Sequence, residues 1–470
     1  MVVGGDAAGL SAASKCKREA PDREVVVFEK GAWVSYAHCG TPYFVKGEVE
    51  KLEDLLSLTP EEIAERGIDL RRGHEVLGVD TDARTVRVAG PDGEFEQPYG
   101  DLLVATGARA LTSPVDGTDL DGVHTLHGLD AAAAIRAHLL DPAADPLADV
   151  GGEAFVDRER VERYGDMDPP ETVAIVGGGY VGVEMAEAFS AHECDVHLFQ
   201  RSEHVLTPFG ESVGKAVTEE LRERGVDLHL ETEVAELTGD GRVERLRCGD
   251  GTELETELAL VGVGIRPNTD FLAGAGLETD GNDAILTDDH GHTGVDGVYA
   301  AGDCATMEHA VTGEPAWVPL GLTANRAGRA IGSTVAGDPE PVGTIAGTAV
   351  VKAFDCEAGR TGIIDPDRAR EAGFEPVAET VTAGSRSGYY PGNAETTVTL
   401  LADRESGLLL GGNIVGTDRA AIRVDILATA IEQGATVGEL ERTDLAYAPP
   451  FSPVWDPVLV GAKVLRGSME

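Results

Sequence analysis

The feature of this sequence that most constrains its fold is a pattern that occurs twice. Each copy starts with an apolar strand, passes through a glycine-rich turn into a helix, and ends in a second strand; the copies occupy residues 1–30 and 173–201. This order is typical of the βαβ unit, in which the turn and the helix N-terminus face a phosphate group. Two such units predict an α/β protein with two dinucleotide sites.

The first unit lacks one glycine of the GxGxxG pattern. Gly4, Asp6 and Gly9 occupy its three slots, and Glu29 ends the next strand, 20 residues after Gly9. A carboxylate at that place accepts hydrogen bonds from ribose hydroxyls, so we predict a nucleotide site; a tight turn without a ligand is the alternative. The strand before Gly4 is shorter than the about five residues usual for a strand. One interpretation is that native residues are missing before Met1, which would weaken the first sheet and its cofactor site.

The second unit carries all three glycines of the pattern: Gly177, Gly179 and Gly182. Gln200 stands where Glu29 stands in the first unit, and Arg201 and Ser202 follow it. A carboxylate there would repel a 2′-phosphate, whereas Gln200 does not and the next two side chains can bind it. This favours NADPH over NADH. In the alternative, Arg201 is only solvated and both nucleotides are used.

Acidic residues outnumber basic residues along the whole chain. The sequence has 83 Asp and Glu against 38 Lys and Arg, which gives a net charge of −45. A field of this sign repels nucleic acids and anionic membranes, so we expect neither as a partner. We interpret the surplus as adaptation to a cytoplasm rich in salt, which screens the charges. An ordinary acidic protein is the alternative.

Targeting, membrane and metal signals are missing from the sequence. It has no signal-peptide pattern and no run of about 20 apolar residues. Its six Cys form no CxxC pair and no zinc-site spacing. We therefore expect a cytoplasmic protein with reduced thiols and no metal site.

Two further segments, residues 104–108 and 301–303, end apolar strands in tight turns. With the two glycine-rich units, they resemble the pyridine nucleotide–disulfide reductase family, which carries two dinucleotides, over nearly the whole chain. The resemblance implies two Rossmann-like domains, which bind FAD and NAD(P)H, and a C-terminal α+β dimerisation domain. The FAD contacts it implies are Gly4, Asp6, Ala7, Ala8, Gly9, Glu29, Lys30, Thr106, Gly107 and Asp303. The NADPH contacts are Gly177, Gly179, Tyr180, Gly182, Glu184, Gln200, Arg201 and Ser202, with Tyr180 as a movable cover and Glu184 near the nicotinamide.

These expectations divide the chain into three domains. The FAD-binding domain is discontinuous and comprises residues 1–115 and 287–335. The NAD(P)H-binding domain comprises residues 116–286, with a polar, acidic insertion near 141–170. The dimerisation domain comprises residues 340–470, where alternating strands replace the earlier pattern.

The segment of residues 33–43 carries the predicted redox centre. Glutathione-reductase-like members have two Cys five positions apart here, but this chain has Val34 in the first position and only Cys39 in the second. A single Cys cannot pair with a neighbour, so it must cycle as a mixed disulfide, a persulfide or a sulfenic acid. A Cys that merely packs in the interior is the alternative. The segment resembles the single-cysteine branch of coenzyme A disulfide reductases, NADH oxidases, NADH peroxidases and persulfide or polysulfide reductases.

Three features bear on which branch is closest. Oxidase- and peroxidase-like members carry a His in the first glycine-rich turn, where this chain has Ala8. The segments around Tyr389 (Tyr-Tyr-Pro-Gly) and Tyr447 (Ala-Tyr-Ala-Pro-Pro) resemble those of coenzyme A disulfide reductases. In that family both Tyr come from the partner subunit and face the Cys, which implies a homodimer with shared active sites. Two ordinary interface Tyr are the alternative.

The resemblance also implies substrate contacts at Arg18, Ser35 and His38. Arg18 would pair with a phosphate of coenzyme A, unless it is only a solvated helix residue. His38 stands where the reductases usually have Asn. A protonated His38 would lower the pKa of the Cys39 thiol, unless its side chain points away.

The sequence thus predicts an FAD-dependent NAD(P)H:disulfide oxidoreductase that reduces coenzyme A disulfide, or a related small disulfide or persulfide, through Cys39. NADPH is the expected donor and NADH a possible one. The first alternative is an NAD(P)H oxidase or peroxidase that uses a Cys39 sulfenic acid. The second is a flavin-binding redox sensor with little turnover.

Overall fold

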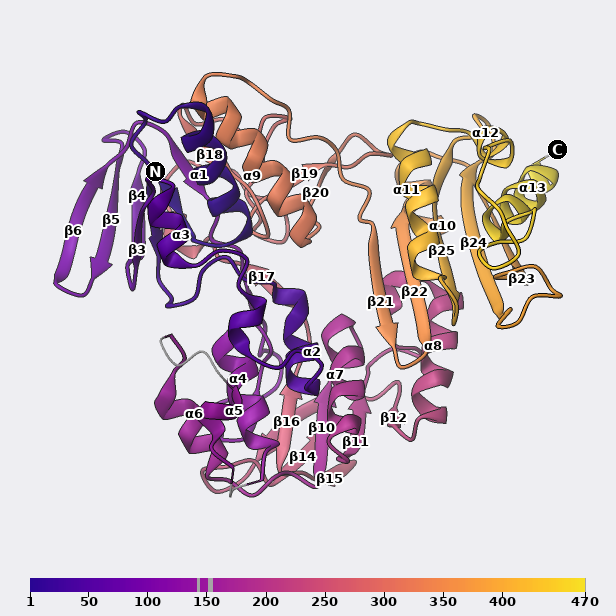
Figure 1. Ribbon diagram of the computed structural model, residues 1–470, viewed down its shortest axis with the longest axis horizontal. Helices are drawn as coiled ribbons and strands as arrows, with labels where there is room; N and C mark the ends of the chain where they lie inside the picture. Colours follow the sequence, from indigo (N-terminus) through magenta and orange to yellow (C-terminus); the bar gives the residue numbers. More distant parts are fainter. Residues whose placement is uncertain (142–143, 151–154, 470) are drawn as a thin grey trace.

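The computed structural model describes residues 1–141, 144–150 and 155–469, and three five-stranded sheets organise them (Figure 1). The first sheet is parallel, in the order β18-β7-β1-β2-β3. Its strands are β1 (Val2–Val3), β2 (Val26–Glu29), β3 (Asp69–Arg72), β7 (Leu102–Val104) and β18 (Val298–Ala300). Segments almost 300 residues apart in sequence therefore share one sheet, and β1 in its centre is two residues long.

Small residues let two helices pack closely on the first sheet. Helix α1 (Ala7–Glu19) follows the first glycine-rich turn, and α9 (Gly321–Ala336) packs beside α1 (Figure 1). A Cβ on Gly328 would lie 2.2 Å from the carbonyl oxygen of Ala8, and one on Gly332 would lie 2.4 Å from that of Ala12. The contact therefore requires glycine on α9.

The second sheet repeats the plan of the first. It is parallel, in the order β12-β11-β10-β16-β9, with the strand before the glycine-rich turn again in the centre. Its strands are β9 (Val123–His124), β10 (Thr172–Val176), β11 (Asp195–Phe199), β12 (Asp227–His229) and β16 (Leu258–Val261). Its helices are α4 (Leu129–His138), α7 (Tyr180–Ala191) and α8 (Glu211–Glu223). A sheet of β13 (Val234–Thr238), β14 (Arg245–Cys248) and β15 (Glu253–Glu255) covers the other face.

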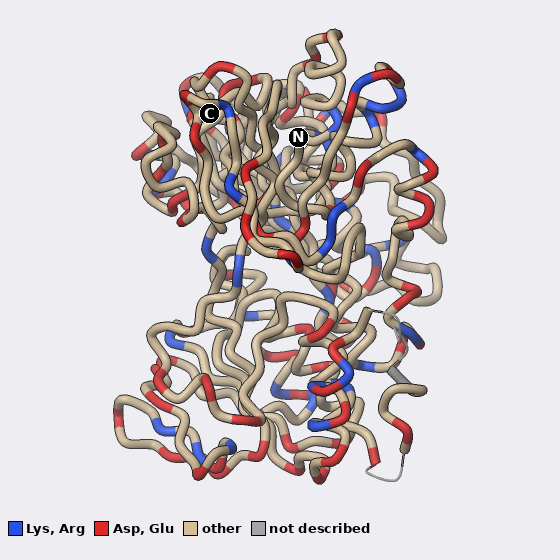
Figure 2. Tube along the Cα trace, turned by 90° about the vertical axis from the view of Figure 1, so that its left-hand side faces the viewer, with Lys and Arg blue, Asp and Glu red and all other residues tan. Residues whose placement is uncertain are grey.

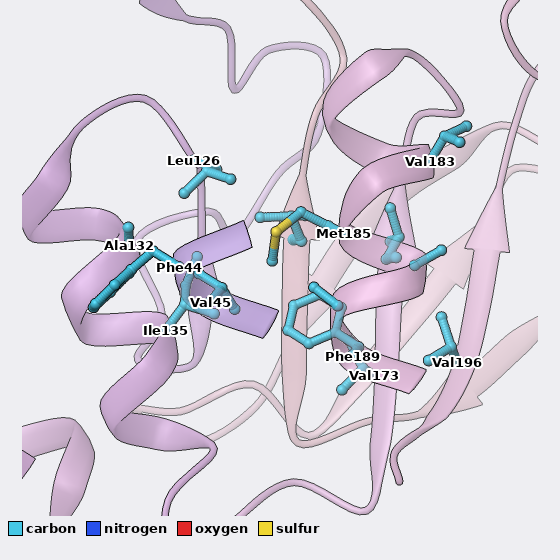
Figure 3. Close-up of a cluster of buried hydrophobic side chains, with 14 of the residues drawn as sticks. Phe44, Val45, Leu126, Ala132, Ile135, Val173, Val183, Met185, Phe189 and Val196 are labelled. Carbon is cyan, nitrogen blue, oxygen red and sulfur yellow. The ribbon is translucent and has the colours of Figure 1, made fainter. Parts of the chain in front are cut away.

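The core of the second unit also holds the segment that follows Cys39. Figure 3 shows Phe44 and Val45 of α2 (Thr41–Lys46) among Ile135, Met185 and Phe189, which come from α4 and α7. These five side chains are completely buried. The helix after the predicted redox Cys is thereby held against the nicotinamide-side unit.

The third sheet is antiparallel, in the order β21-β22-β25-β24-β23. Its strands are β21 (Ala349–Ala353), β22 (Cys356–Gly362), β23 (Pro376–Gly384), β24 (Glu395–Asp403) and β25 (Leu409–Gly416). Helices α10 (Pro366–Glu371), α11 (Val424–Glu432), α12 (Val437–Glu441) and α13 (Pro457–Met469) pack around it. The predicted fold class, two Rossmann-like units followed by an α+β unit, is confirmed, whereas the exact domain limits stay a prediction.

Shorter elements complete the part of the chain that the structure describes. They are α3 (Pro60–Glu65), α5 (Pro146–Val150), α6 (Arg158–Gly165), the sheet of β4 (Glu75–Asp80), β5 (Thr85–Gly90) and β6 (Gly93–Pro98), and the pairs β8 (Ala108–Ala110) with β17 (Ile265–Pro267) and β19 (Met307–Glu308) with β20 (Pro315–Ala316). The predicted insertion near 141–170 contains α5 and α6, and its residues 142–143 and 151–154 lie outside the described residues.

Acidic residues are scattered over all parts of the chain trace rather than gathered in one place (Figure 2). The interpretation of this surplus as an adaptation to salt stays a prediction. Among the described residues, no helix combines the length and the apolar character that a membrane span needs.

Candidate active site

The first glycine-rich turn depends on close backbone packing at two glycines. Gly4 has a φ of 109°, and a Cβ on it would lie 2.1 Å from the carbonyl oxygen of Ala105 on the neighbouring strand end. A Cβ on Gly9 would lie 2.0 Å from the carbonyl oxygen of Gly4. Glycine is therefore required at both positions for the turn to lead directly from β1 into α1.

The second turn has the same geometry. Gly177 has a φ of 107°, and a Cβ on it would lie 2.3 Å from the carbonyl oxygen of Gly262; a Cβ on Gly182 would lie 1.9 Å from that of Gly177. A Cβ on Gly179, in the middle slot, would meet no atom within 4 Å. This open space before the N-terminus of α7 fits the pyrophosphate of a dinucleotide.

The side chains at the ends of the second strands fold back onto the two turns. Glu29 accepts hydrogen bonds from the backbone N–H groups of Gly5 (2.8 Å) and Gly31 (2.7 Å). Gln200 accepts one from the backbone N–H of Gly178 (3.2 Å). Both are thus held where a ribose would lie, but only Glu29 carries a charge there. Arg201 is exposed and Ser202 is half-buried beside Gln200.

Asp6, which replaces the middle glycine of the first turn, directs its carboxylate toward the Cys39 segment. It accepts a hydrogen bond from the backbone N–H of Tyr36 (3.2 Å) and pairs with Nε2 of His38. Because the side chain leaves the turn, the backbone at the start of α1 stays open to a phosphate. The first unit therefore fits a dinucleotide such as FAD despite the missing glycine.

Two strand ends supply further groups at this site. Asn268 stabilises the turn after β7 with two hydrogen bonds. Its backbone N–H donates to the carbonyl of Gly107 (2.9 Å), and its side-chain amide donates to the carbonyl of Thr106 (3.0 Å). Asp303 follows Gly302, which has a φ of 83°, and the indole of Trp317 donates to the Asp303 carbonyl (2.9 Å). Burial raises the pKa of the Asp303 carboxyl, because removal from water disfavours the charged carboxylate.

Cys39 lies in a short 3-10 turn (His38–Gly40) directly before α2. It is exposed, whereas Cys16, Cys248, Cys304 and Cys356 are buried. Desolvation by the surrounding protein, and then the nearby carboxylate of Glu184, raise the pKa of the Cys39 thiol. This is contrary to the expectation that His38 lowers this pKa, because the imidazole is turned toward Asp6.

Glu184 lies close to the same segment, although it comes from α7. The hydroxyl of Tyr43, four residues after Cys39, donates a weak hydrogen bond to Glu184 Oε1 (3.4 Å). Burial raises the pKa of Glu184 to about 7, so this carboxyl exchanges its proton near neutral pH. Tyr180, at the start of α7, packs edge-on against Phe209 with ring centroids 5.1 Å apart.

The structure gathers several predicted residues around one pocket beside the first turn. Its lining includes Asp6, Ala7, Arg18 and Ser35. Ser35 has a φ of 51°, a conformation uncommon for residues other than glycine, and its N–H donates to the carbonyl of Gly5 (3.2 Å). Strain of this kind concentrates at functional sites. Lys30, in contrast, does not line this pocket and is exposed after β2.

Three cations in this pocket were missed by sequence reasoning: Lys15, Arg66 and Arg329. Together with Arg18 they place four positive side chains around one pocket of a chain with net charge −45. One of the three had a signal in the sequence, because Lys15 and Arg18 recur at helical spacing on α1. Arg66 and Arg329 belong to no motif and reach the pocket only through the fold.

Tyr389 and Tyr447 lie on the C-terminal unit, where they are 82% and 61% exposed. Neither lines the cationic pocket of its own chain. Phe451, Val454 and Trp455, which follow Tyr447, are also exposed. An apolar surface of this kind is typical of a protein–protein interface.

A buried arginine connects the two tyrosine-bearing segments. Arg423 is 6% exposed, and its guanidinium donates to the backbone carbonyls of Ser385 (2.7 Å) and Phe451 (3.3 Å) and to the Asp456 carboxylate (3.0 Å). Ser385 begins the segment of Tyr389, and Phe451 follows that of Tyr447. One side chain therefore fixes both loops relative to each other.

Comparison with known proteins gives the family. Residues 1–316 match the family described as "Pyridine nucleotide-disulphide oxidoreductase", and residues 348–457 match its dimerisation domain. The chain belongs to this family. It is therefore an FAD-dependent pyridine nucleotide–disulfide oxidoreductase, as the resemblance implied.

The relatives carry names from more than one branch. An "NAD(P)H coenzyme A polysulfide/persulfide reductase" of Pyrococcus horikoshii is 37% identical over 467 residues, which cover 99% of this chain and 98% of the relative. An "NADH oxidase" of Methanocaldococcus jannaschii is 29% identical over 469 residues, which cover 98% of this chain and 97% of the relative. A solved structure of an NAD-dependent persulfide reductase from A. fulgidus superposes with a TM-score of 0.90 at 30% identity, covering 99% of this chain and 83% of that one.

Proposed function

We propose that this protein reduces coenzyme A disulfide, or a related small disulfide or persulfide, with electrons from NADPH that pass through FAD to Cys39. The observation that carries the proposal is the cationic pocket next to the Cys39 segment. Lys15 is paired with Glu19 (2.5 Å), but Arg18, Arg66 and Arg329 add further positive charge to this pocket of a chain of net charge −45, which favours an anionic substrate. Coenzyme A carries anionic phosphate groups, and the name of the P. horikoshii relative includes coenzyme A.

The first glycine-rich turn and Glu29 would hold FAD, which when bound would supply two-electron transfer from the nicotinamide to sulfur. The Cys39 thiolate attacks a disulfide RSSR, forms a mixed disulfide and releases RS⁻. Two electrons and one proton then split this mixed disulfide into the Cys39 thiolate and RSH. The sum is NADPH + H⁺ + RSSR giving NADP⁺ and two RSH.

Residues of this chain have defined tasks in that cycle. Arg18, Lys15, Arg66 and Arg329 hold the phosphates of the substrate. Tyr447 and Tyr389 act from the partner subunit of a homodimer, where a phenol donates a proton to the departing thiolate. Their exposure in the single chain supports a role at an interface.

NADPH is the proposed donor because of the residues beside the second turn. Gln200 is held toward the ribose without a negative charge, and Arg201 and Ser202 are next to it. A 2′-phosphate is therefore accepted rather than repelled.

An NAD(P)H oxidase or peroxidase is the second candidate, which the M. jannaschii relative supports by its name. Ala8 disfavours it, because this buried residue occupies the position where the oxidase- and peroxidase-like members are expected to carry a His. An alanine side chain has no group that could exchange a proton beside the sulfur.

Mass spectrometry of the resting, flavin-loaded protein separates the candidates. The disulfide reductase retains coenzyme A, or another small thiol, as a mixed disulfide on Cys39. A sulfenic or sulfinic acid on Cys39, with no thiol adduct even after incubation with coenzyme A disulfide, supports the oxidase or peroxidase. Formation of the adduct without subsequent NADPH consumption supports a sensor with little turnover.

A further inference from the structure

Two histidines and two aspartates gather at the edge of the second sheet, away from the cationic pocket. Strands β11 and β12 are parallel, and their register places His197 opposite Asp227. Side chains alternate along a strand, so Asp195 lies on the same face as His197, and His229 on the same face as Asp227. All four side chains therefore point to one side of this edge.

The distances among these groups suit a metal ion. Nδ1 of His197 lies 3.1 Å from Nε2 of His229 and 3.9 Å from Oδ2 of Asp227. Ligand atoms around one zinc ion, with bonds of about 2.0–2.2 Å, are separated by roughly 3–4 Å. Asp195, His197 and Asp227 each place one ligand atom within 4.8 Å of the others, and His229 adjoins this group through its contact with His197.

Asp195 occupies the place of a supporting group. Its Oδ2 lies 3.4 Å from Nε2 of His197, on the opposite side of the ring from Nδ1. In metal sites the second nitrogen of a ligand imidazole commonly donates to a carboxylate, which fixes the ring and its tautomer. His229 is held by stacking on Phe199, with centroids 4.2 Å apart and ring planes 6° from parallel.

We propose that His197, His229 and Asp227 bind a divalent transition-metal ion of the Zn²⁺ type, with Asp195 orienting His197. Two imidazoles and one carboxylate match the preference of borderline cations, and the two carboxylates balance a double positive charge. Asp227 and Asp195 are mostly exposed, so water reaches the remaining coordination position. None of the four residues lines the cationic pocket, although the backbone carbonyl of His229 accepts a hydrogen bond from the N–H of Gln200 (2.9 Å) in the proposed NADPH site.

The competing explanation is a simple N–H···N hydrogen bond between His197 and His229. It would use the same 3.1 Å distance without any metal. Isothermal titration calorimetry with ZnCl₂ distinguishes the metal site from the hydrogen bond. The protein is the flavin-loaded Cys39→Ser variant, because the exposed thiol of Cys39 could itself bind zinc. It is freed of metal with a chelator and titrated in concentrated NaCl.

We expect one Zn²⁺ per chain, with binding lost in His197→Gln and in His229→Gln and weakened about tenfold or more in Asp227→Asn. His290→Gln is the matched control, because half-buried His290 lies beside the exposed Asp288 and Asp289 in another group of possible ligands, and binding should persist in this variant. The proposal is overturned if the unsubstituted protein binds no zinc, if both histidine variants bind as before, or if His290→Gln removes binding.

Zinc-edge X-ray absorption of the loaded protein provides a measurement that needs no folded variant. Two imidazole nitrogens with oxygen ligands support the site. Sulfur ligands, or a shell without imidazole, overturn it.

Discussion

The imidazole of His38 is paired with the carboxylate of Asp6, 32 residues earlier in the chain. Asp6 stands in place of the middle glycine of the first turn, and His38 stands where the related reductases are expected to have Asn. The pair connects the start of α1 to the segment of Cys39.

This pair makes the charge of His38 depend on Asp6. Burial lowers the pKa of His38, but the hydrogen bond and the charge of Asp6 outweigh it, so the pKa lies above its ordinary value of 6.5. In Asp6→Asn both raising contributions of Asp6 are lost, while burial, the largest effect, and the charge of Asp303 remain, so we expect the His38 pKa to fall below 6.5. NMR titration of the His38 ring measures this, with the ring of His290 as an internal control. An unchanged His38 pKa in Asp6→Asn would show that the pair does not exist in solution.

Arg423 should control the stability of the C-terminal unit. In Arg423→Met the buried Asp456 loses its charged partner and four backbone carbonyls lose a donor, which costs about 3–5 kcal/mol of the free energy of unfolding. Urea unfolding in concentrated salt measures this loss. The double variant Arg423→Met/Asp456→Leu, which leaves no unpaired charge, should be more stable than Arg423→Met alone. Equal stability of Arg423→Met and the unsubstituted protein would show that the contacts of Arg423 do not stabilise this unit.

Gln200 should set the choice of nucleotide. In Gln200→Glu the carboxylate repels a 2′-phosphate and pairs with a free 2′-hydroxyl, so we expect kcat/KM for NADPH to fall by about tenfold or more and that for NADH to rise. Steady-state rates with both donors measure the change. Arg201→Ala should weaken use of NADPH while leaving use of NADH unaltered. A preference that stays the same in both variants would contradict an NADPH site at these residues.

His138 should make the protein sensitive to acid. It is 3% exposed, and burial lowers its pKa to about 4. The unfolded chain, with a His pKa of about 6.5, binds the proton more tightly. The neutral ring therefore contributes fully to stability above pH 6.5. As the pH falls from 6.5 toward about 4, we expect the free energy of unfolding to decrease by about 2–3 kcal/mol. His138→Leu should flatten the dependence of unfolding on pH between 7.5 and 5. His290→Leu, at a half-buried position, should not, and an equal slope in both variants would contradict the prediction.

The glycine-rich turns could be predicted because their physical requirements are local. Only glycine fits at Gly4, Gly9, Gly177 and Gly182, since a Cβ at each would meet a backbone oxygen about 2 Å away. The repeated strand–turn–helix pattern then determines the two parallel sheets. Cys39 could also be proposed as the redox residue from the sequence, because the motif around it is continuous in sequence. That role stays a prediction.

What the sequence did not reveal depends on contacts between distant segments. The Asp6–His38 pair and the cations Arg66 and Arg329 come together only when α1, α9 and the segments around them pack. The raised pKa of Cys39 follows from burial and from Glu184 on a helix of the second unit. No spacing or periodicity encodes these distances.

The most direct test of the central claim is anaerobic stopped-flow reoxidation of the NADPH-reduced protein by coenzyme A disulfide in concentrated salt. We predict rapid reoxidation with two thiols released per NADPH consumed, slowed by about a thousandfold in Cys39→Ser while reduction by NADPH is retained. Reoxidation that is equally fast in Cys39→Ser, or that occurs only when oxygen or peroxide is admitted, would contradict it.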